Sequence, residues 1–295
     1  MTLGVIGSNG RLAGELIRLA SLDQISLRLS SSKLSSNSTF LDLSQRISFS
    51  DLDEVFSEVE SLVYLASTMD EKSTFLNKDS KMYLMNVENL SIVAKWSHFN
   101  RKHLIYISGG IVYRDIHSNG ILEISEIGLN DFGGVYGESK YLGEIEIEKQ
   151  VLDGLKACMI RPSSIYGGNK LKNGMIENFI SGALKDKRIE ICPPFEQVIG
   201  FVHAHDVATS ILFAYHNKLK GAFNVSQSEN ISVLKICEII SGITSCQLIL
   251  KSDNQDGSVR DLDRYKLLSD KIKELGWSEY YDIETGIRQC INVFK

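Results

Sequence analysis

The chain has 295 residues, of which 43% are hydrophobic and 23% are charged, a composition typical of a folded globular protein and not of a disordered one. Its formal net charge is −5, from 32 basic and 37 acidic residues, and it contains no sustained basic run. Neither nucleic acid nor an anionic membrane is therefore an expected partner. The length suits one large α/β domain or two smaller ones.

The five cysteines are an odd number, are widely spaced and include no Cys-x-x-Cys pair. This pattern favours neither a disulfide framework nor a zinc site, and it fits a reduced cytoplasmic setting. No apolar run approaches the roughly 18 residues that span a bilayer. Glycine and charged residues interrupt the N-terminal segment before it could form a secretory signal. We expect a cytoplasmic protein that holds no metal.

The first half of the chain alternates apolar runs with helical patterns. Apolar runs at 3–6, 25–29, 62–66 and 103–108 read as strands. Helical spacing is expected around 14–20, 83–94 and 135–152. Strands that alternate with helices predict right-handed βαβ crossovers and a parallel sheet.

The second half has a looser pattern. A strand at 157–160 is followed by a glycine-interrupted stretch, a helix near 176–184 and a short strand at 188–191. The segment 198–215 reads as a strand and helix that return to the main body. The sequence thus predicts a dinucleotide-binding domain, 1–162 with 198–215, and a smaller mixed α/β domain, 163–197 and 216–295.

The segment GSNGRLAGEL follows the first strand and contains Gly7, Gly10 and Gly14. Glycine lets the backbone turn sharply and approach a pyrophosphate, and the next helix offers free N–H groups and a positive dipole end. The alternative is a strand–helix turn that binds nothing. Because the loop opens a βαβ series, we favour a dinucleotide site.

The end of the second strand bears on which dinucleotide is bound. An NAD-binding Rossmann fold usually places Asp or Glu about 20 residues after the glycines, on the ribose 2′-hydroxyl. Here the segment runs from Arg28 through Ser30 to Lys33 without a carboxylate. A 2′-phosphate could be held there, which favours NADP(H) and leaves NAD(H) possible. The alternative is a solvated loop. Asp42 could lie beside the adenine or simply on the surface.

Tyr136 and Lys140 are four residues apart at the start of a predicted helix, so they share one face. A nearby cation lowers the pKa of a phenol towards the range useful for proton transfer. Tyr166 and Lys170 have the same spacing but lie among glycines, and we treat them as a chance match. Ser108 ends the preceding strand, where ligands bind on open parallel sheets.

His203 and His205 alternate on a predicted strand, which is the spacing of a metal-binding pair. No third ligand stands at a recognisable spacing, so a structural role is favoured. Asp206 is expected to cap the helix that follows.

These segments together resemble the extended short-chain dehydrogenases/reductases, the group of nucleotide-sugar epimerases, dehydratases and reductases. The resemblance covers nearly the whole chain. It rests on GSNGRLAGEL, LVYLAS, YISGGIVY, YGESKYLGE, RPSSIYGG, FVHAHDVA, FNVS and SDKIKELGW, and on Asn86. It implies a Rossmann-type doubly wound parallel sheet with a smaller C-terminal domain for a nucleotide-sugar.

The resemblance also implies roles for individual residues. Ser108, Tyr136 and Lys140 would be catalytic, and Asn86 would support the helix that carries the lysine. The expected substrate contacts are Ser108, Gly109, Gly110, Asn178 and Arg260. The expected cofactor contacts are Gly7, Ser8, Asn9, Gly10, Arg11, Leu12, Arg28, Ser30, Lys33, Asp42, Leu43, Leu65, Ala66, Ser67, Asn86, Tyr136, Lys140 and Arg161. The helix of Tyr136 would also form half of a homodimer interface.

Three departures from the family pattern bear on function. Ile107 replaces a Ser or Thr that often precedes the serine, and Ile199-Gly200 stand where an arginine is often found. Gly109-Gly110 occupy the place of the Asp-Glu pair that dehydratases use to remove water, which argues against dehydration.

Three hypotheses follow. The favoured one is an NADP(H)-dependent reductase of a nucleotide-linked 4-keto-6-deoxy sugar, with Tyr136 as proton donor. The second is an NAD-dependent nucleotide-sugar 4-epimerase that uses the same three residues. The third is a dinucleotide-binding regulator that turns nothing over.

Overall fold

The computed structural model describes residues 2–32, 38–69, 76–169, 174–229, 231–252 and 264–295. Its centre is a seven-stranded sheet in which every neighbouring pair of strands is parallel. The strand order is β12-β7-β5-β4-β1-β2-β3. The strands are β1 (Thr2–Ile6), β2 (Ser26–Ser31), β3 (Thr39–Phe40), β4 (Ser61–Tyr64), β5 (His103–Ile107), β7 (Ala157–Pro162) and β12 (Gly221–Val225).

The central strands are buried along nearly their whole length. Every residue of β4, β5 and β7 is buried, as are four of the five in β1. Continuous apolar strands of this kind are typical of a parallel sheet covered on both faces. The doubly wound Rossmann-type fold expected from the sequence is therefore confirmed.

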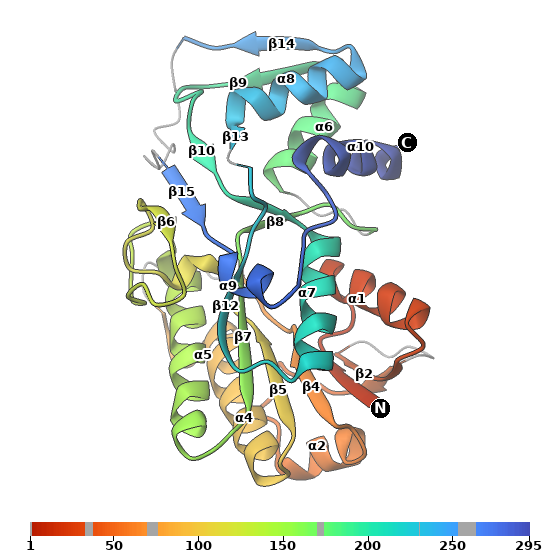
Figure 1. Cartoon of the computed structure of the whole chain (residues 1–295), viewed down its shortest axis with the longest axis vertical. Helices are drawn as coiled ribbons and strands as arrows, with labels where there is room; N and C mark the ends of the chain where they lie inside the picture. Colours follow the sequence, from red (N-terminus) through yellow and green to blue (C-terminus); the bar gives the residue numbers. More distant parts are fainter. Residues whose placement is uncertain (1, 33–37, 70–75, 170–173, 230, 253–263) are drawn as a thin grey trace.

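Helices cover both faces of this sheet (Figure 1). One face carries α1 and α7, which pack closely against each other. The other face carries α2, α4 and α5, and α4 packs against both α2 and α5. The bounds are α1 (Arg11–Leu22), α2 (Phe49–Phe56), α4 (Asn89–Phe99), α5 (Gly134–Leu152) and α7 (Ala204–Asn217). In the described residues, no helix is long and apolar enough to cross a membrane.

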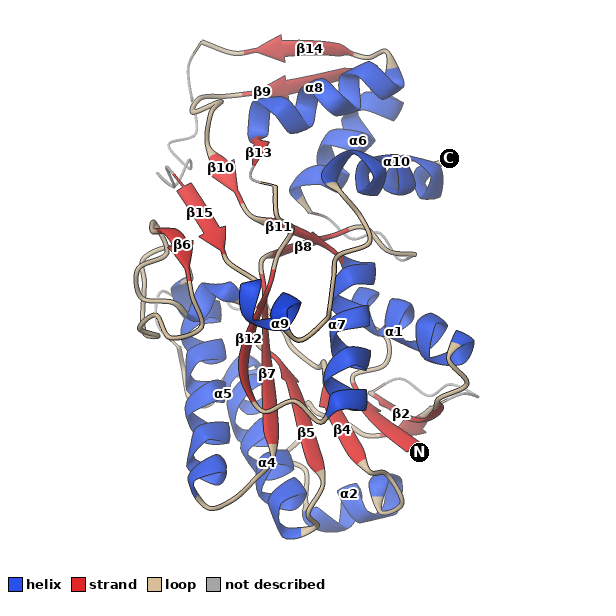
Figure 2. Cartoon of the chain, in the orientation of Figure 1, coloured by secondary structure: helices blue, strands red, loops and turns tan. Residues whose placement is uncertain are grey.

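Short elements complete this larger lobe and join it to the smaller one. Two turns of non-α helix, a π-helix η1 (Leu84–Glu88) and a 3₁₀ helix η2 (Gly110–Val112), lie next to the pocket described below. A parallel pair, β8 and β11, crosses between the lobes (Figure 2). The remaining bounds are α3 (Lys81–Tyr83), β8 (Ser164–Tyr166), β11 (Phe201–His203) and α9 (Asp270–Glu274).

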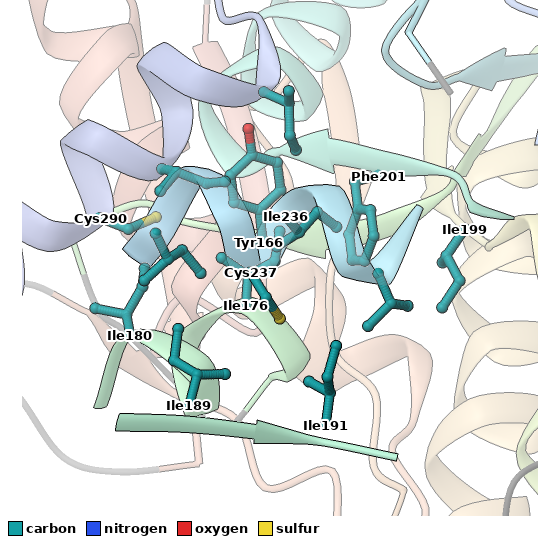
Figure 3. Packing of buried hydrophobic residues seen from close by; sticks show 14 of the residues in the cluster. Tyr166, Ile176, Ile180, Ile189, Ile191, Ile199, Phe201, Ile236, Cys237 and Cys290 are labelled. Atoms are coloured by element: carbon teal, nitrogen blue, oxygen red, sulfur yellow. The ribbon is translucent and has the colours of Figure 1, made fainter. Parts of the chain in front are cut away.

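The smaller lobe has its own hydrophobic core. It combines three helices with a parallel strand pair, β9–β14, and a mixed sheet in the order β13-β10-β15-β6. Ile176, Ile236 and Cys237 lie together in its core, near Tyr166 and Phe201 (Figure 3). The bounds are α6 (Met175–Lys185), α8 (Val233–Thr244), α10 (Ile283–Phe294), β6 (Asn119–Ile121), β9 (Arg188–Ile191), β10 (Val198–Ile199), β13 (Ile231–Ser232), β14 (Gln247–Leu250) and β15 (Arg264–Leu267).

The second lobe is thus mixed α/β as expected, but its sequence limits differ from the expected ones. All residues after 215 were expected to belong to this lobe. In the structure, β12 pairs with β7 at the edge of the seven-stranded sheet, and α9 packs on β12. Residues 221–225 therefore belong to the larger lobe. In the other direction, β6 of the first half belongs to the smaller lobe, because it pairs with β15.

Candidate active site

A cavity of about 480 Å³ opens at the carboxyl ends of β1, β2, β4 and β5, and Ile165 of the connecting strand β8 also lines it. This is the edge at which ligands bind on open parallel sheets. The lining comes mainly from loops that follow these strands, from the first turn of α1 and from α5. It consists of Gly7, Asn9, Gly10, Arg11, Leu12, Ala13, Ser31, Ser32, Leu41, Leu43, Leu65, Ala66, Ser67, Met69, Met85, Ile107, Ser108, Tyr136, Lys140 and Ile165.

Gly7 makes the turn from β1 into the cavity wall. Its φ is +91°, and a Cβ built there would lie 2.7 Å from the Ala66 nitrogen, so only glycine fits. The N–H groups of Gly7 and Ser8 both donate to the Ser30 carbonyl, at 3.2 and 3.0 Å. These donors tie the turn to β2, which explains why Ser8 and Ser30 are buried behind the cavity instead of lining it.

Helix α1 begins directly after Gly10 and points its N-terminus at the cavity. Gly10 is the N-cap and gives no side-chain hydrogen bond to the first turn. A Cβ at Gly10 would meet only the Gly7 carbonyl, at 4.0 Å. The first-turn N–H groups therefore remain open to an anion, as a pyrophosphate requires. The helix starts three residues earlier than the predicted 14–20, so Arg11 and Leu12 belong to that first turn.

The end of β2 forms a polar but uncharged wall. The Asn9 side-chain amide donates to the Ser31 hydroxyl at 2.5 Å, and Ser32 lies beside it in the lining. Among the described residues, no carboxylate lines the cavity. Arg28 lies in the middle of β2, and its guanidinium is 3.8 Å from the Glu58 carboxylate. Arg28 is not part of the wall, and Lys33 lies outside the described residues.

Asp42 also stays out of the cavity. Its carboxylate accepts hydrogen bonds from the Ser44 amide and hydroxyl, at 2.9 and 2.7 Å. These bonds lower the pKa of Asp42. The side chain shapes its own loop and leaves its neighbours Leu41 and Leu43 to line the cavity.

Tyr136 and Lys140 both reach the cavity from the first turns of α5. Burial raises the pKa of Tyr136, and a hydrogen bond with the Ser67 side chain offsets part of that rise. The Lys140 ammonium donates to the Ile107 carbonyl at 2.9 Å and lies 5.8 Å from the Tyr136 ring centroid. The helical spacing of Tyr136 and Lys140 predicted that the lysine lowers the phenol pKa, but in the structure burial is the larger influence and raises it.

Burial acts on the lysine as well. It lowers the pKa of Lys140 from 10.5 to about 7, and the negative charge of Glu144 raises it in part. Glu144 is one helical turn further along α5 and is fully buried. A lysine with a pKa near neutrality is suited to take part in proton transfer.

Ser108 follows β5, and its hydroxyl is buried without a hydrogen-bond partner. The residue is 5% exposed and lines the cavity beside Tyr136 and Lys140. Native structures seldom leave a buried hydroxyl unpaired unless a ligand completes its bonding. This orphan hydroxyl fits a substrate oxygen.

Asn86 connects the cavity wall to the helix that carries Tyr136. Its side chain exchanges two hydrogen bonds with the Thr68 backbone, at 3.0 and 3.1 Å, and donates to Ser139 at 2.9 Å. The Ser139 hydroxyl donates in turn to the Tyr136 carbonyl at 2.8 Å. Asn86 lies in the π-helical turn η1, a type of distortion that often occurs at functional sites. It lies behind the lining, as a support.

Arg161 is held away from the cavity by a buried network. Its guanidinium makes three hydrogen bonds to the Glu144 carboxylate, at 2.6 to 3.2 Å, and a fourth to the Tyr113 hydroxyl at 2.9 Å. Tyr113 donates to the Asn224 side chain at 2.6 Å. Arg161 thus joins α5 to β7 and β12, and it does not contact the cofactor region.

The expected substrate residues are scattered. Gly109 precedes η2 beside Ser108. Gly110 packs under β15, where a Cβ would collide with the Tyr265 hydroxyl and Leu267. Asn178 is an exposed residue of α6 outside the cavity lining, and Arg260 lies outside the described residues.

The second tyrosine candidate and the histidines have structural contacts. The Tyr166 hydroxyl accepts from the Gln227 side chain at 3.2 Å, and its ring packs edge-on against Phe201. His203, not Asp206, caps α7. The Asp206 carboxylate instead accepts the amides of Tyr280 and Tyr281, at 2.8 and 3.3 Å. The described residues contain no cluster of three metal-binding side chains.

Sequence reasoning missed several parts of the site. Asn9 was noted, but its bond to Ser31 was not, and the apolar residues Met69, Met85 and Ile165 were not considered. Met69 lies in the loop after β4, Met85 in the helical turn η1 and Ile165 within the short strand β8, and nothing in their local sequence pattern indicates a cavity.

Comparisons with known proteins bear on the family and the fold. A model of the NAD dependent epimerase/dehydratase family matches residues 5–226. A trifunctional UDP-glucose 4,6-dehydratase/UDP-4-keto-6-deoxy-D-glucose 3,5-epimerase/UDP-4-keto-L-rhamnose-reductase of Arabidopsis thaliana is 26% identical over 142 residues, which are 47% of this chain and 21% of that protein. Most of that relative therefore lies outside the match.

Solved structures match nearly the whole fold. A UDP-glucose 4-epimerase of Thermus thermophilus, in complex with NAD, has a TM-score of 0.82 at 17% identity and covers 100% of this chain and 99% of its own. A dTDP-4-dehydrorhamnose reductase of Bacillus anthracis, in complex with NADP, has a TM-score of 0.80 at 19% identity, with coverage of 100% and 99%. At these identities the likeness establishes the fold.

Proposed function

This chain belongs to the NAD dependent epimerase/dehydratase family, and we propose that it is an NADP(H)-dependent reductase of a nucleotide-linked 4-keto-6-deoxy sugar. Its family makes it an oxidoreductase or epimerase that uses a nicotinamide dinucleotide. The observation that carries the proposal is the meeting of Ser108, Tyr136 and Lys140 in one cavity with the open N-terminus of α1. Ser108 can then bind the carbonyl of the sugar, Tyr136 can donate a proton to it, and the N-terminus of α1 can bind the pyrophosphate of the cofactor in the same cavity.

The residues present fit such a cofactor. The first turn of α1 would hold the pyrophosphate, and Lys140 would hold the nicotinamide ribose. Asn9, Ser31 and Ser32 would surround the adenosine ribose. When bound, the dinucleotide supplies the hydride for reduction.

The chain's own residues supply the rest of the reaction. The Ser108 hydroxyl orients the keto oxygen of the sugar. Tyr136 donates its phenolic proton to that oxygen, and its raised pKa keeps it protonated at neutral pH. The Lys140 ammonium stabilises the phenolate left behind. This direction of proton transfer is the one that reduction needs.

Two features support reduction over the other reactions of the family. The wall at the end of β2 carries serines and no described carboxylate, which favours NADP(H) over NAD(H). Gly109-Gly110 supply no acid–base pair beside Ser108, so elimination of water has no catalyst there. By analogy with the reductase named above, whose structure holds NADP, the substrate would be a keto sugar on a nucleoside diphosphate.

Tyr136→Phe tests the mechanism. It removes only the hydroxyl, and we expect turnover to fall about 10³-fold while cofactor affinity changes little. Tyr166→Phe is the matched control, because Tyr166 has the same spacing to a lysine and should keep its activity. Unchanged turnover in Tyr136→Phe, measured by cofactor oxidation with a keto-sugar nucleotide, contradicts the mechanism.

A further inference from the structure

Arg11 and Glu177 form an ion pair that joins the two lobes at the edge of the cavity. Arg11 is the first residue of α1 and lines the cavity, and Glu177 lies in the first turn of α6. The Arg11 guanidinium donates to the Glu177 Oε1 atom across 166 residues of sequence. The arginine side chain is 15% exposed, and that of the glutamate is 2% exposed.

Glu177 also fixes the glycine turn that starts the small lobe. Its Oε1 atom accepts the Gly167 amide at 3.1 Å. A Cβ at Gly168 would lie 3.5 Å from the Arg11 Cγ, so the arginine stem packs against that turn. Both glycines have positive φ, and a Cβ at Gly167 would collide with His203. The Gly167–Gly168 turn therefore has little freedom to move away from Arg11.

The bonding of Glu177 is incomplete on one side. Its Oε2 atom is buried and has no hydrogen-bond partner. A buried carboxylate with an unpaired oxygen is held mainly by its one cation. Arg11 is therefore the main group that compensates the negative charge of Glu177.

Arg11 stands at the place where the family's cofactor needs positive charge. The N-terminus of α1 presents N–H groups to a pyrophosphate, which carries negative charge. Because Glu177 neutralises the guanidinium, those N–H groups act without a full cation beside them. We propose, on the basis of the function proposed above, that Glu177 is a positioning residue that restrains Arg11 and so limits cofactor affinity.

Such a restraint suits a reductase, in which oxidised cofactor must leave after every turnover. An arginine free to pair with the pyrophosphate forms strong, charge-assisted hydrogen bonds and retains the product cofactor. With Glu177 in place, Arg11 keeps the two lobes in register through the Gly167–Gly168 turn, and the cofactor exchanges.

Glu177→Gln tests this inference. Glutamine keeps an acceptor for the Gly167 amide but removes the charge, so Arg11 becomes free to meet the pyrophosphate. We expect the dissociation constant of NADPH, measured by fluorescence titration without sugar substrate, to fall about five-fold. Its salt dependence should also steepen, since an added cation–phosphate contact is screened by salt.

A double-mutant cycle assigns the effect to the pair. Arg11→Met alone exposes the Glu177 charge to the pyrophosphate, so affinity should weaken. In Arg11→Met/Glu177→Gln both charges are absent, so affinity should recover from the loss in Arg11→Met but should not become tighter than that of the wild type. Glu284→Gln on α10, which makes the same charge change at an exposed pair, should leave affinity unchanged.

The inference is overturned if Glu177→Gln weakens or does not alter cofactor binding, or if Arg11→Met/Glu177→Gln binds NADPH more tightly than the wild type does. If Glu177→Gln does not fold, Arg11→Met still tests the inference, because unchanged NADPH affinity in Arg11→Met would also contradict it. The titration needs no turnover. It therefore stands apart from the Tyr136→Phe experiment, which decides the proposed reaction.

Discussion

Two buried arginine–glutamate pairs lie in different regions of this molecule and differ in how completely they are enclosed. Arg161 and Glu144 lie within the large lobe, at 3% and 0% exposure, and every carboxylate oxygen accepts a hydrogen bond. Arg11 and Glu177 lie between the lobes, with the arginine facing the cavity and one carboxylate oxygen unpaired. The comparison teaches that an enclosed pair fixes a helix, whereas a pair at a cavity edge is placed to respond to a ligand.

The largest expected difference between the pairs is in stability. Arg161→Met leaves Glu144 as an uncompensated charge inside the core, and we expect the free energy of unfolding to fall by about 4 kcal/mol. Arg11→Met should cost less, about 3 kcal/mol, because the arginine that it removes borders the cavity and its loss lets water approach the buried Glu177 carboxylate. Urea denaturation measures both. Equal losses in the two variants would remove the distinction between the pairs.

Arg288→Met is the control for that experiment. Arg288 pairs with Glu284 on the surface of α10, where both side chains are about half exposed. An exposed helical pair contributes about 0.5 kcal/mol or less. A larger loss in this variant would indicate that removing any arginine destabilises the chain.

A smaller effect is expected from the lysine next to the enclosed pair. Burial lowers the pKa of Lys140 to about 7 from 10.5, so the folded state binds fewer protons than the unfolded state between these pH values. The charged lysine therefore costs stability in full below pH 7, and the cost disappears as pH rises towards 10.5. Lys140→Met should stabilise the protein by about 2 kcal/mol near pH 6 and progressively less at alkaline pH.

Thermal or chemical unfolding across pH checks this prediction. Lys149→Met, on the same helix but with a side chain 59% exposed, should show no such pH-dependent gain. A destabilised Lys140→Met at pH 6 would show that the hydrogen bond to Ile107 outweighs the burial of the charge.

The smallest expected effect is on the pH dependence of catalysis. Protonated Lys140 stabilises the Tyr136 phenolate, so the reduction rate should decline as pH rises above about 7. Because the negative charge of Glu144 raises the pKa of Lys140, Glu144→Gln should move that decline to lower pH by about 0.5. A pH–rate profile of kcat measures it, and an unmoved midpoint would show that Glu144 acts only on the position of α5.

The sequence predicted the parts of the site that depend on local pattern. Gly7 and Gly10 stand where a strand meets a helix, and Ser108 ends an apolar run, so their places follow from chain order alone. Tyr136 was separated from Tyr166 because one begins a helix and the other lies among glycines. The structure brings Ser108, Tyr136 and Lys140 to one cavity.

The parts that sequence reasoning missed depend on partners far along the chain. Arg161 was expected at the cofactor, but its hydrogen bonds to Glu144 and Tyr113 hold it in a buried network outside the cavity lining. Residues 221–225 were assigned to the small lobe because a three-residue apolar pattern does not show which sheet the strand joins. No spacing rule connects Arg11 to Glu177 across 166 residues. Homodimer formation through α5 stays a prediction.

The central claim is net reduction by NADPH at the Tyr136 site. Its most direct test is the stoichiometry of the cofactor: protein is purified, denatured to release any bound dinucleotide, and in parallel supplied with NADPH and a panel of nucleotide-linked 4-keto-6-deoxy sugars. The account predicts little retained NAD and one NADPH oxidised for each keto sugar reduced. Stoichiometric bound NAD, with sugar epimerised and no net oxidation of NADPH, would contradict it and establish the epimerase alternative.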